Sequence, residues 1–317
     1  MLLRIVETIN RSRTFLITSH VRLDGDSLGS ELALYNILKG MGKEVIVYNQ
    51  SKTPGNYLFL PGTSGIVHDL KDPEKYDVAF VLDCSDLERI GDQASRVGGM
   101  KRIINIDHHV SNGGFCELAY IDSEASSTGE LIYRLIVRMG IVPTKEVADN
   151  LYTAIMTDTG GFRYRSTKEE TLHAAGCLVA HGADPQWLSE NIYENNPMEK
   201  ISLLNEALKT LTFYLNGRAA SMVVSLESIA TTGALSEHIE GFVDVPRTVR
   251  GVEVSILYLE LSKNCYKLSF RSKGKINVEK VARRFGGGGH TNAAACQIAG
   301  ELETIKGQVT EALSVVI

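Results

Sequence analysis

The chain has 317 residues, a formal net charge of −5 at pH 7 and 44% hydrophobic residues. This length predicts two domains, and the apolar content is sufficient for a core in each of them. The net negative charge excludes a protein that coats long nucleic acid, because such a protein would be basic overall. A local basic patch would suffice to bind short nucleotides. No stretch reaches the roughly 18 apolar residues of a membrane span, and no signal-peptide cleavage site is visible, so we expect no membrane association.

The cysteines indicate a reducing compartment. There are five of them, an odd number, and they form no Cys-x-x-Cys pair. They are Cys84, Cys116, Cys177, Cys265 and Cys296. Scattered cysteines of this kind are typical of reduced and mostly buried thiols, so we expect a cytoplasmic protein.

The first half of the chain alternates predicted strands with predicted helices. After a short helix within residues 1–13, apolar runs predict strands at residues 14–18, 44–48, 77–82 and 102–106. Helical patterns follow at residues 28–39, 126–139, 144–155 and 167–193. Strands separated by helices or long crossovers predict an α/β fold with a mostly parallel, doubly wound sheet. Ligands of such sheets bind at the carboxyl ends of the strands, so the residues after each strand are the first candidates for a site.

The loop after the first predicted strand carries one histidine and two acids, namely His20, Asp24 and Asp26. Their side chains can converge if the loop curls, and Gly25 permits such a curl. The alternative is that Asp26 or Ser27 only caps the following helix. We favour convergence, because a cap needs a single acid and has no use for His20.

Acids and histidines also follow the later strands. Asp83 comes directly after the third predicted strand, and Asp107, His108 and His109 end the fourth. Asp158 stands before Thr-Gly-Gly at the end of a predicted helix. A lone acid in that position is more often a turn residue, but here it belongs to a series of similar strand and helix ends.

These residues form an acid-rich set in which imidazole is the only nitrogen donor and thiolate is absent. Such donors suit Mn²⁺ or Mg²⁺ better than structural Zn²⁺. So many acids in one cleft require cations, because like charges would otherwise force protonation. Two ions roughly 3.5–4 Å apart can bind a bridging hydroxide and stabilise in-line displacement at phosphorus. The set therefore predicts metal-dependent hydrolysis of a phosphoester or phosphoanhydride.

From about residue 205 the pattern changes to paired strands. Residues 211–214 and 219–224 are separated by Asn216-Gly217, which predicts a hairpin. Further strands are predicted at 252–261 and 265–271, with helices at 277–284 and 301–314. The second half is therefore expected to be a smaller α/β domain with a mixed sheet, joined to the first by a linker around Glu194-Asn195-Asn196-Pro197.

Four consecutive glycines, Gly286–Gly289, precede His290. Glycines allow backbone N–H groups to approach an anion closely, and a helix expected after them would direct its N-terminus at a phosphate. The run is no Walker loop, since Gly-Lys-Ser/Thr is missing. His290 can donate to a phosphate oxygen, and Arg271, at a predicted strand end, is a better candidate contact than Arg283 or Arg284. A flexible surface loop is the alternative.

Five motifs, in this order, resemble those of a known family. HVRLDGDSLGS, VLDCSD, NIDHHVSN and MTDTGGFRY are similar to the metal-binding motifs of the DHH phosphoesterase superfamily, and RFGGGGHTNAAAC resembles the glycine-rich motif of the DHH-associated C-terminal domain. The resemblance covers nearly the whole chain. The length is similar to that of the oligoribonuclease and pAp phosphatase branch (NrnA-like). Family II pyrophosphatases lack the four-glycine-histidine run, and membrane-bound cyclic-dinucleotide phosphodiesterases carry additional domains.

The resemblance implies two metal sites that share the carboxylate of Asp83. One ion would also be bound by His20 and Asp24. The other ion would also be bound by Asp26, His108 and Asp158. His109 would contact the scissile phosphate or the leaving group as a catalytic residue. Asp107 would support catalysis by orienting a histidine.

The resemblance also implies where the substrate is held and how the chain is divided. His290 and the backbone amides of the glycine run would hold a substrate phosphate with help from Arg271; the glycines concerned are Gly287, Gly288 and Gly289. A catalytic metal-binding domain would span residues 1–190, a linker residues 191–205 and a substrate-binding domain residues 206–317. The two domains would close over the substrate in a cleft between them.

The implied function is a two-ion Mn²⁺-dependent phosphoesterase, with Mg²⁺ as the alternative ion. It would release mononucleotides from short RNA and convert pAp to AMP. A preference for linear or cyclic dinucleotides, such as pApA or c-di-AMP, is one alternative, and a catalytically silent nucleotide-binding regulator is another, disfavoured because no ligand is missing. Long nucleic acid is not expected as a partner, because its binding depends on many contacts to phosphates, which an acidic chain does not offer. If the chain associates, a homodimer is the expected form.

Overall fold

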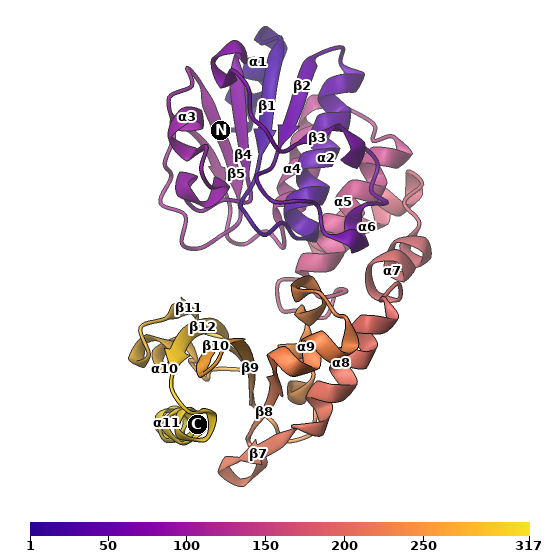
Figure 1. The fold of residues 1–317 in the computed structure, drawn as a ribbon. Coiled ribbons are helices and arrows are strands. Elements are labelled where there is room, and N and C mark those ends of the chain that lie inside the picture. The colour runs from indigo at the N-terminus through magenta and orange to yellow at the C-terminus, as the bar shows by residue number, and fades with distance from the viewer. The chain divides into compact units, whose positions relative to one another are not determined.

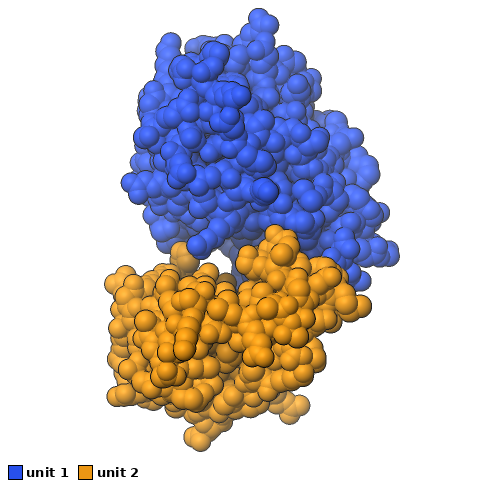
Figure 2. Space-filling view, in the orientation of Figure 1, with its two compact units in different colours: residues 1–195 blue, residues 196–317 orange.

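The computed structural model describes residues 1–317, which divide into two units, Met1–Asn195 and Asn196–Ile317 (Figure 2). The first unit is organised around a parallel sheet of six strands in the order β3-β2-β1-β4-β5-β6. The strands are β1 (Thr14–Thr18), β2 (Glu44–Tyr48), β3 (Ile66–Val67), β4 (Val78–Leu82), β5 (Ile103–Asp107) and β6 (Leu118–Ile121). The predicted parallel sheet is thus confirmed, and β3 and β6 are short additions at its two edges.

Helices cover both faces of this sheet unequally (Figure 1). The helices of the unit are α1 (Leu2–Arg11), α2 (Gly25–Gly40), α3 (Ala94–Gly98), α4 (Thr128–Met139), α5 (Lys145–Asp158), α6 (Glu169–Ala180) and α7 (Pro185–Tyr193). The larger core joins alternate strand residues to α1, α2 and α4, with α5 packed on α2 and α4. A smaller core covers the opposite face with α3 and its neighbouring loops. Because the central strands are buried on both sides, their sequences are continuous apolar runs rather than alternating ones.

The helix predicted over residues 167–193 is two helices, α6 and α7. The chain turns at Gly182, whose φ is +98°, and Pro185 then starts α7. Proline is well tolerated in the first turn of a helix, whereas in a helix interior it removes a hydrogen bond. The predicted linker, residues 191–205, contains the end of α7, residues 194–197 and the first part of α8 (Met198–Lys209).

The second unit is a mixed sheet of six strands in the order β11-β12-β10-β9-β8-β7. Its strands are β7 (Thr212–Tyr214), β8 (Ala219–Val224), β9 (Val254–Ser262), β10 (Cys265–Ser272), β11 (Gly288–His290) and β12 (Ala293–Ala299). Only the β8–β9 pair is parallel, and the four other pairs are antiparallel. The helices α10 (Glu279–Arg284) and α11 (Leu302–Ser314) pack on one core, and α8 packs on another. A further helix, α9 (Leu226–Thr232), follows β8. The predicted mixed α/β architecture is confirmed.

The prediction of a helix after the glycine run is wrong. The last two glycines of the run and His290 form β11, and the alanine-rich segment Ala293–Ala299 that follows is β12. Alanine has the highest helix propensity, but β12 hydrogen-bonds to β10 over seven residues and to β11 on its other side. Tertiary pairing has therefore overridden local propensity, and no helix N-terminus follows His290. In the whole structure, no helix has both the length and the apolar content needed to span a membrane.

Close packing of α2, α4 and α5 depends on glycines. A Cβ added at Gly29 would lie 2.4 Å from the carbonyl oxygen of Asn150 and 2.9 Å from Cβ of Ala154 on α5. A Cβ at Gly129 of α4 would lie 2.4 Å from the same Ala154 Cβ. Any larger residue at these positions would push α5 away, and α5 ends at Asp158.

We therefore expect Gly29→Ala to lower the free energy of unfolding by about 1–3 kcal/mol, as overpacking of a core does. Gly176→Ala is the matched control, because Gly176 is an exposed helical position with no atom near its added Cβ. That control should be neutral or stabilising by up to about 1 kcal/mol. Urea unfolding measures both variants, and a Gly29→Ala protein as stable as wild type would contradict the packing argument.

Candidate metal centre

The predicted ligands come from five different elements of the first unit and meet beyond the carboxyl ends of its central strands. His20 follows β1 and Asp83 follows β4. His108 follows β5, Asp26 lies in the first turn of α2, and Asp158 is the last residue of α5. Parallel strands end at one edge of a sheet, which explains how residues far apart in sequence reach one place.

Three overlapping groups of these side chains could each hold a metal ion. In each group the candidate ligand atoms lie within 4.8 Å of one another. The groups are His20 with Asp24 and Asp83, Asp26 with His108 and Asp158, and Asp83 with His108 and His109. All seven residues had been singled out in the sequence, and the structure brings them together.

Asp83 belongs to two of the three groups, and His108 connects the third group to them. Its Oδ2 lies 3.2 Å from Nε2 of His20, and its Oδ1 lies 3.7 Å from Nε2 of His108. Nε2 of His20 is also 3.8 Å from Oδ2 of Asp24. The two oxygens of one buried carboxylate thus face two different sets of donors, which is the arrangement that a ligand shared between two cations requires.

The second set is centred on His108. Its Nε2 lies 3.6 Å from Oδ2 of Asp26 and 3.4 Å from Oδ2 of Asp158. Asp26 is buried, whereas the side chain of Asp158 is 36% exposed. This side of the cluster is therefore open to solvent at Asp158, where a small ion can enter.

Asp24 has a second task, because it caps α2. Its Oδ1 accepts a hydrogen bond from the backbone N–H of Ser27 at 3.0 Å, and the Ser27 hydroxyl accepts one from the backbone N–H of Asp24 at 2.9 Å. From the sequence, Asp26 or Ser27 was considered only as an alternative, as the cap of this helix. The cap is Asp24 instead, and its Oδ2 still faces His20.

Asp107 lies behind His109 and belongs to none of the three groups. It is fully buried, and its Oδ1 accepts a hydrogen bond from Nδ1 of His109 at 2.7 Å. Burial opposes ionisation of Asp107, but the hydrogen bonds and charge of His109 together with a hydrogen bond from Asn112 outweigh it, so the pKa of Asp107 is lowered. A carboxylate on Nδ1 fixes the tautomer and the ring orientation and leaves Nε2 free.

A network of two asparagines fastens the loops after β4 and β5 to each other, and the sequence analysis missed it. Nδ2 of Asn105 donates to the carbonyl oxygens of Val81 and Cys84 at 3.0 and 3.1 Å. Nδ2 of Asn112 donates to Oδ2 of Asp107 at 2.6 Å and also reaches Cys84. Asn105 is fully buried in an otherwise apolar strand. A buried amide needs hydrogen-bond partners, so this residue was the signal in the sequence that could have indicated the network.

The charges of the cluster are unbalanced without a cation. Burial, and then the charge of Asp158, raises the pKa of Asp26 to about 7. Burial, and then the charges of Asp26 and Asp24, raises the pKa of Asp83 well above its usual value. Burial similarly raises the pKa of Asp158 to about 6. Each carboxyl group thus resists ionisation, which a bound divalent cation would reverse, so the donor set fits a metal.

The pKa of His108 also reflects the excess of negative charge in the cluster. Burial of its ring lowers its pKa, but the carboxylates of Asp26, Asp158 and Asp83 outweigh burial and raise the pKa to about 9. In the absence of metal the imidazolium therefore supplies positive charge among the acids. A cation would take over that role and compete with the proton for His108.

The predicted substrate residues lie in the second unit, on neighbouring strands. Arg271 of β10 is opposite Ala293 of β12, and Ala293 is opposite His290 of β11. Residues directly opposite each other in antiparallel pairs project from the same face, so Arg271 and His290 lie in one row, with a small alanine between them. The row is about 10 Å wide between its outer strands, which is two strand spacings.

The glycines at the start of β11 and just before it allow close contact with β12. A Cβ at Gly287 would lie 2.1 Å from the carbonyl oxygen of Ala295, and one at Gly289, whose φ is +147°, would lie 2.4 Å from that of Ala293. Gly288 has no atom near its added Cβ, and the backbone of β11 is exposed at the edge of the sheet. An edge strand presents unpaired N–H groups, which are available to an anion.

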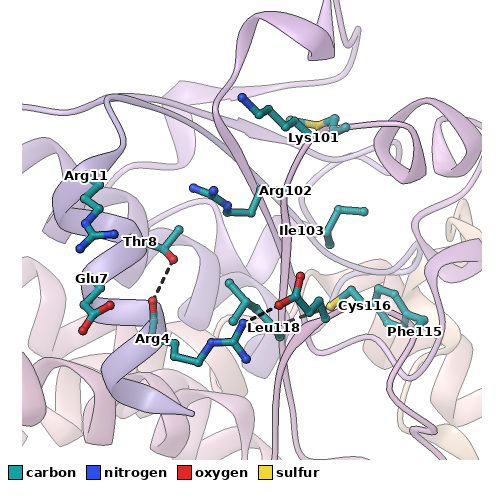
Figure 3. Close-up of a pocket in the computed structure, with 12 residues that line it drawn as sticks. Arg4, Glu7, Thr8, Arg11, Lys101, Arg102, Ile103, Phe115, Cys116 and Leu118 are labelled. Carbon is teal, nitrogen blue, oxygen red and sulfur yellow. Dashed lines mark hydrogen bonds and ion pairs between the residues drawn. The ribbon is translucent and has the colours of Figure 1, made fainter.

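A hollow of about 490 Å³ elsewhere in the first unit contains none of these residues (Figure 3). It lies between α1 and the amino ends of β5 and β6, at the opposite edge of the sheet from the metal ligands. Its charged lining consists of Arg4, Glu7, Arg11, Lys101, Arg102 and Glu117. These side chains are exposed, and Arg4 pairs with Glu117. The hollow is therefore separate from the candidate metal centre.

Comparisons with known proteins identify the family of the chain. The model of the DHH family N-terminal domain matches residues 14–155, and that of the DHHA1 domain matches residues 220–317. A Thermus thermophilus protein named bifunctional oligoribonuclease and PAP phosphatase NrnA is 33% identical over 302 residues, covering 94% of this chain and 88% of its own. A Bacillus subtilis protein of the same name is 27% identical over 299 residues, with 93% and 92% covered.

A solved structure is also similar along its whole length. An exopolyphosphatase-related protein from Bacteroides fragilis matches with a TM-score of 0.94 and 31% identity, over 99% of this chain and 95% of that one. The match therefore includes both units. The chain belongs to the DHH family and carries a DHHA1 domain.

The raised pKa values predict how the stability of the metal-free protein depends on pH. The folded-state pKa values of Asp26, Asp158 and His108 all lie above the ordinary values of 3.8 for aspartate and 6.5 for histidine. Their contribution to stability is thus fully present below the ordinary values and is lost as pH rises through the folded values. We expect the Tm in EDTA to fall between about pH 5 and pH 8.

Saturating Mn²⁺ should remove most of this fall, because bound metal stabilises the ionised acids. Asp26→Asn in EDTA should show a smaller fall than wild type, since one of the titrating groups is gone. Differential scanning calorimetry at several pH values makes the comparison. A Tm in EDTA that is level or rises over this range would contradict the charge imbalance.

Proposed function

We propose that this protein is a metal-dependent phosphoesterase that hydrolyses short oligoribonucleotides to mononucleotides and converts pAp to AMP. The observation that carries the proposal is the acid–histidine cluster in which Asp83 is shared between groups of ligand atoms. Membership of the DHH family supports it, as do the names of the Thermus thermophilus and Bacillus subtilis relatives. Mn²⁺ is the proposed ion, with Mg²⁺ as the alternative, because the donors are carboxylates and imidazoles.

Two sets of ligands would hold two cations on either side of Asp83. One set is His20 and Asp24, and the other is Asp26, His108 and Asp158. When bound, the cations would activate the attacking water and offset the negative charge that develops on the phosphoryl oxygens. Asp83 would fix the separation of the two sets, since one oxygen of its carboxylate faces each of them.

His109 would act on the substrate. Its Nδ1 is held by Asp107, so Nε2 is the atom available to donate a hydrogen bond to the scissile phosphate or the leaving group. Asp107 would hold the ring in the orientation that this hydrogen bond needs, and it would stabilise positive charge on the imidazole. In this proposal Asp107 is a positioning residue, and His109 is a catalytic one.

The second unit would bind the rest of the substrate. We propose that His290, Arg271 and the backbone N–H groups of Gly288 and Gly289 hold a substrate phosphate. The N–H of Gly287, which the sequence also suggested, donates instead to the carbonyl oxygen of Ala282 at 2.9 Å. The row formed by Arg271 and His290 supports this, because charge-assisted hydrogen bonds to phosphate are strong. Catalysis and binding would thus be divided between residues 1–190 and 206–317, joined by residues 191–205. The cytoplasmic location and the homodimer expected from the sequence stay predictions.

A panel of four substrates with Mn²⁺ tests the proposal: pAp, pApA, a 5-mer RNA and a 24-mer RNA. We expect turnover of pAp and the 5-mer and little turnover of the 24-mer, because the chain offers few phosphate contacts to a long strand. Asp83→Asn should lower kcat at least about 1,000-fold, as removal of a central electrostatic group does. Asp86→Asn is the matched control, because Asp86 caps a short turn after β4 and asparagine caps equally well.

The outcomes separate the candidate activities. A strong preference for pApA with little turnover of pAp would replace the proposed substrate with dinucleotides. Nucleotide binding without hydrolysis of any of the four compounds would contradict the enzyme itself. Equal activity of Asp83→Asn and Asp86→Asn would show that hydrolysis occurs elsewhere in the chain.

A further inference from the structure

Thr128, the first residue of α4, contacts two predicted metal ligands at once. Its backbone N–H donates to Oδ2 of Asp26 at 2.7 Å, and its hydroxyl donates to Oδ1 of Asp83 at 3.1 Å. The next N–H of the helix, that of Gly129, donates to Oδ1 of Asp26 at 2.9 Å. Thr128 is fully buried, so water does not compete for these hydrogen bonds.

The hydroxyl of Thr128 is not needed to start the helix. Ser127 is the cap of α4, and its hydroxyl oxygen accepts a hydrogen bond from the backbone N–H of Glu130 at 3.0 Å. The hydroxyl of Thr128 is therefore free of a capping role, and it points instead to Asp83, 45 residues earlier in the chain. A hydrogen bond of that kind serves the cluster rather than the local helix.

The backbone of Asp83 is held in an uncommon conformation. Its φ is +55°, in the left-handed region that non-glycine residues rarely adopt. The backbone is fixed by a hydrogen bond from the N–H of Asp83 to the carbonyl oxygen of Ile106, and by the hydrogen bonds to Cys84. The rotation of the carboxylate is then set by His20 at one oxygen and by Thr128 at the other.

Asp26 is held in a comparable way. Both of its oxygens accept backbone N–H groups from the first turn of α4, and the positive end of this helix favours a carboxylate there. Oδ1 also accepts a hydrogen bond from the hydroxyl of Ser30 at 3.2 Å, so Oδ2 is the oxygen with a lone pair left for a cation. The first turn of α4 cannot shift easily, because Gly129 is packed against Ala154 of α5.

We infer that Thr128 is a positioning residue of the metal centre, which fixes Asp26 through its N–H and Asp83 through its hydroxyl. This inference rests on the proposed function, since it assumes that the cluster binds divalent cations. The hydroxyl holds Asp83 so that its two oxygens stay directed at the two ligand sets. Without it, the shared carboxylate can rotate, and the separation between the two cations is no longer defined.

The test removes the hydroxyl and then restores it. Thr128→Val keeps the shape and the backbone N–H but has no hydroxyl, and Thr128→Ser restores the donor. Thr153→Val is the matched control, because Thr153 is also fully buried on a helix and its hydroxyl has no hydrogen-bond partner. Binding of Mn²⁺ alone to the metal-free protein is measured from the electron paramagnetic resonance of free Mn²⁺, without any substrate.

We expect Thr128→Val to weaken Mn²⁺ binding by about 10–100-fold, the usual effect of losing a group that orients a ligand. Thr128→Ser should recover most of the affinity, and Thr153→Val should bind like wild type. Urea unfolding of all variants establishes that each is folded during the titration. At a fixed Mn²⁺ concentration below saturation, the apparent kcat for pAp should follow the affinity for Mn²⁺. At saturating Mn²⁺, the KM for pAp should change little.

Two results would overturn the inference. One is Mn²⁺ affinity in Thr128→Val equal to that of wild type and Thr153→Val. The other is an equal loss in Thr128→Ser and Thr128→Val, because the hydroxyl would then be irrelevant. Failure of wild type itself to bind Mn²⁺ is a different result, which would contradict the proposed function and this inference together.

Discussion

Three carboxyl groups and an imidazole lie close together beyond the carboxyl ends of the central strands of the first unit, and the repulsion between the carboxylates and the cost of burying them must be offset. Asp26 and Asp83 are almost completely buried, and the charge of Asp158 adds to the cost of ionising them. In a folded protein such a cluster is stable only with protons or with cations. Much of the surrounding structure holds these groups in place against that repulsion.

The supporting elements are of three kinds. The first turn of α4 directs two N–H groups and a hydroxyl at the acids. Asn105 and Asn112 fasten the loops after β4 and β5 to each other. Glycines on α2 and α4 let α5 approach closely enough for Asp158 to reach His108. The packing of α5 against α2 and α4 therefore contributes to the geometry of the proposed chemistry.

The sequence was sufficient to single out the acids and histidines that cluster, but not the residues that hold them in place. His20, Asp83 and His108 follow apolar strands, and the carboxyl ends of parallel strands meet at one edge, so their convergence was predictable. Thr128 was visible only as part of a helix start. Its contact with Asp83 spans 45 residues and depends on how α4 packs, which no local pattern encodes.

The one wrong prediction in the second unit has a similar origin. An alanine-rich segment after four glycines predicts a helix by propensity, yet Ala293–Ala299 pairs with β10 and β11 instead. The register of that pairing then places Arg271 and His290 in one row, although 18 residues separate them in the chain. Neither the strand nor the row follows from local sequence, because both depend on pairing between distant segments.

The central claim is that two divalent cations bind at this cluster and share Asp83. Anomalous diffraction from crystals soaked in Mn²⁺ measures it directly. The account predicts two peaks about 3.5–4 Å apart on either side of the Asp83 carboxylate, one beside His20 and Asp24 and the other beside Asp26, His108 and Asp158. Strong Mn²⁺ peaks at other places, with none beside Asp83, would contradict it.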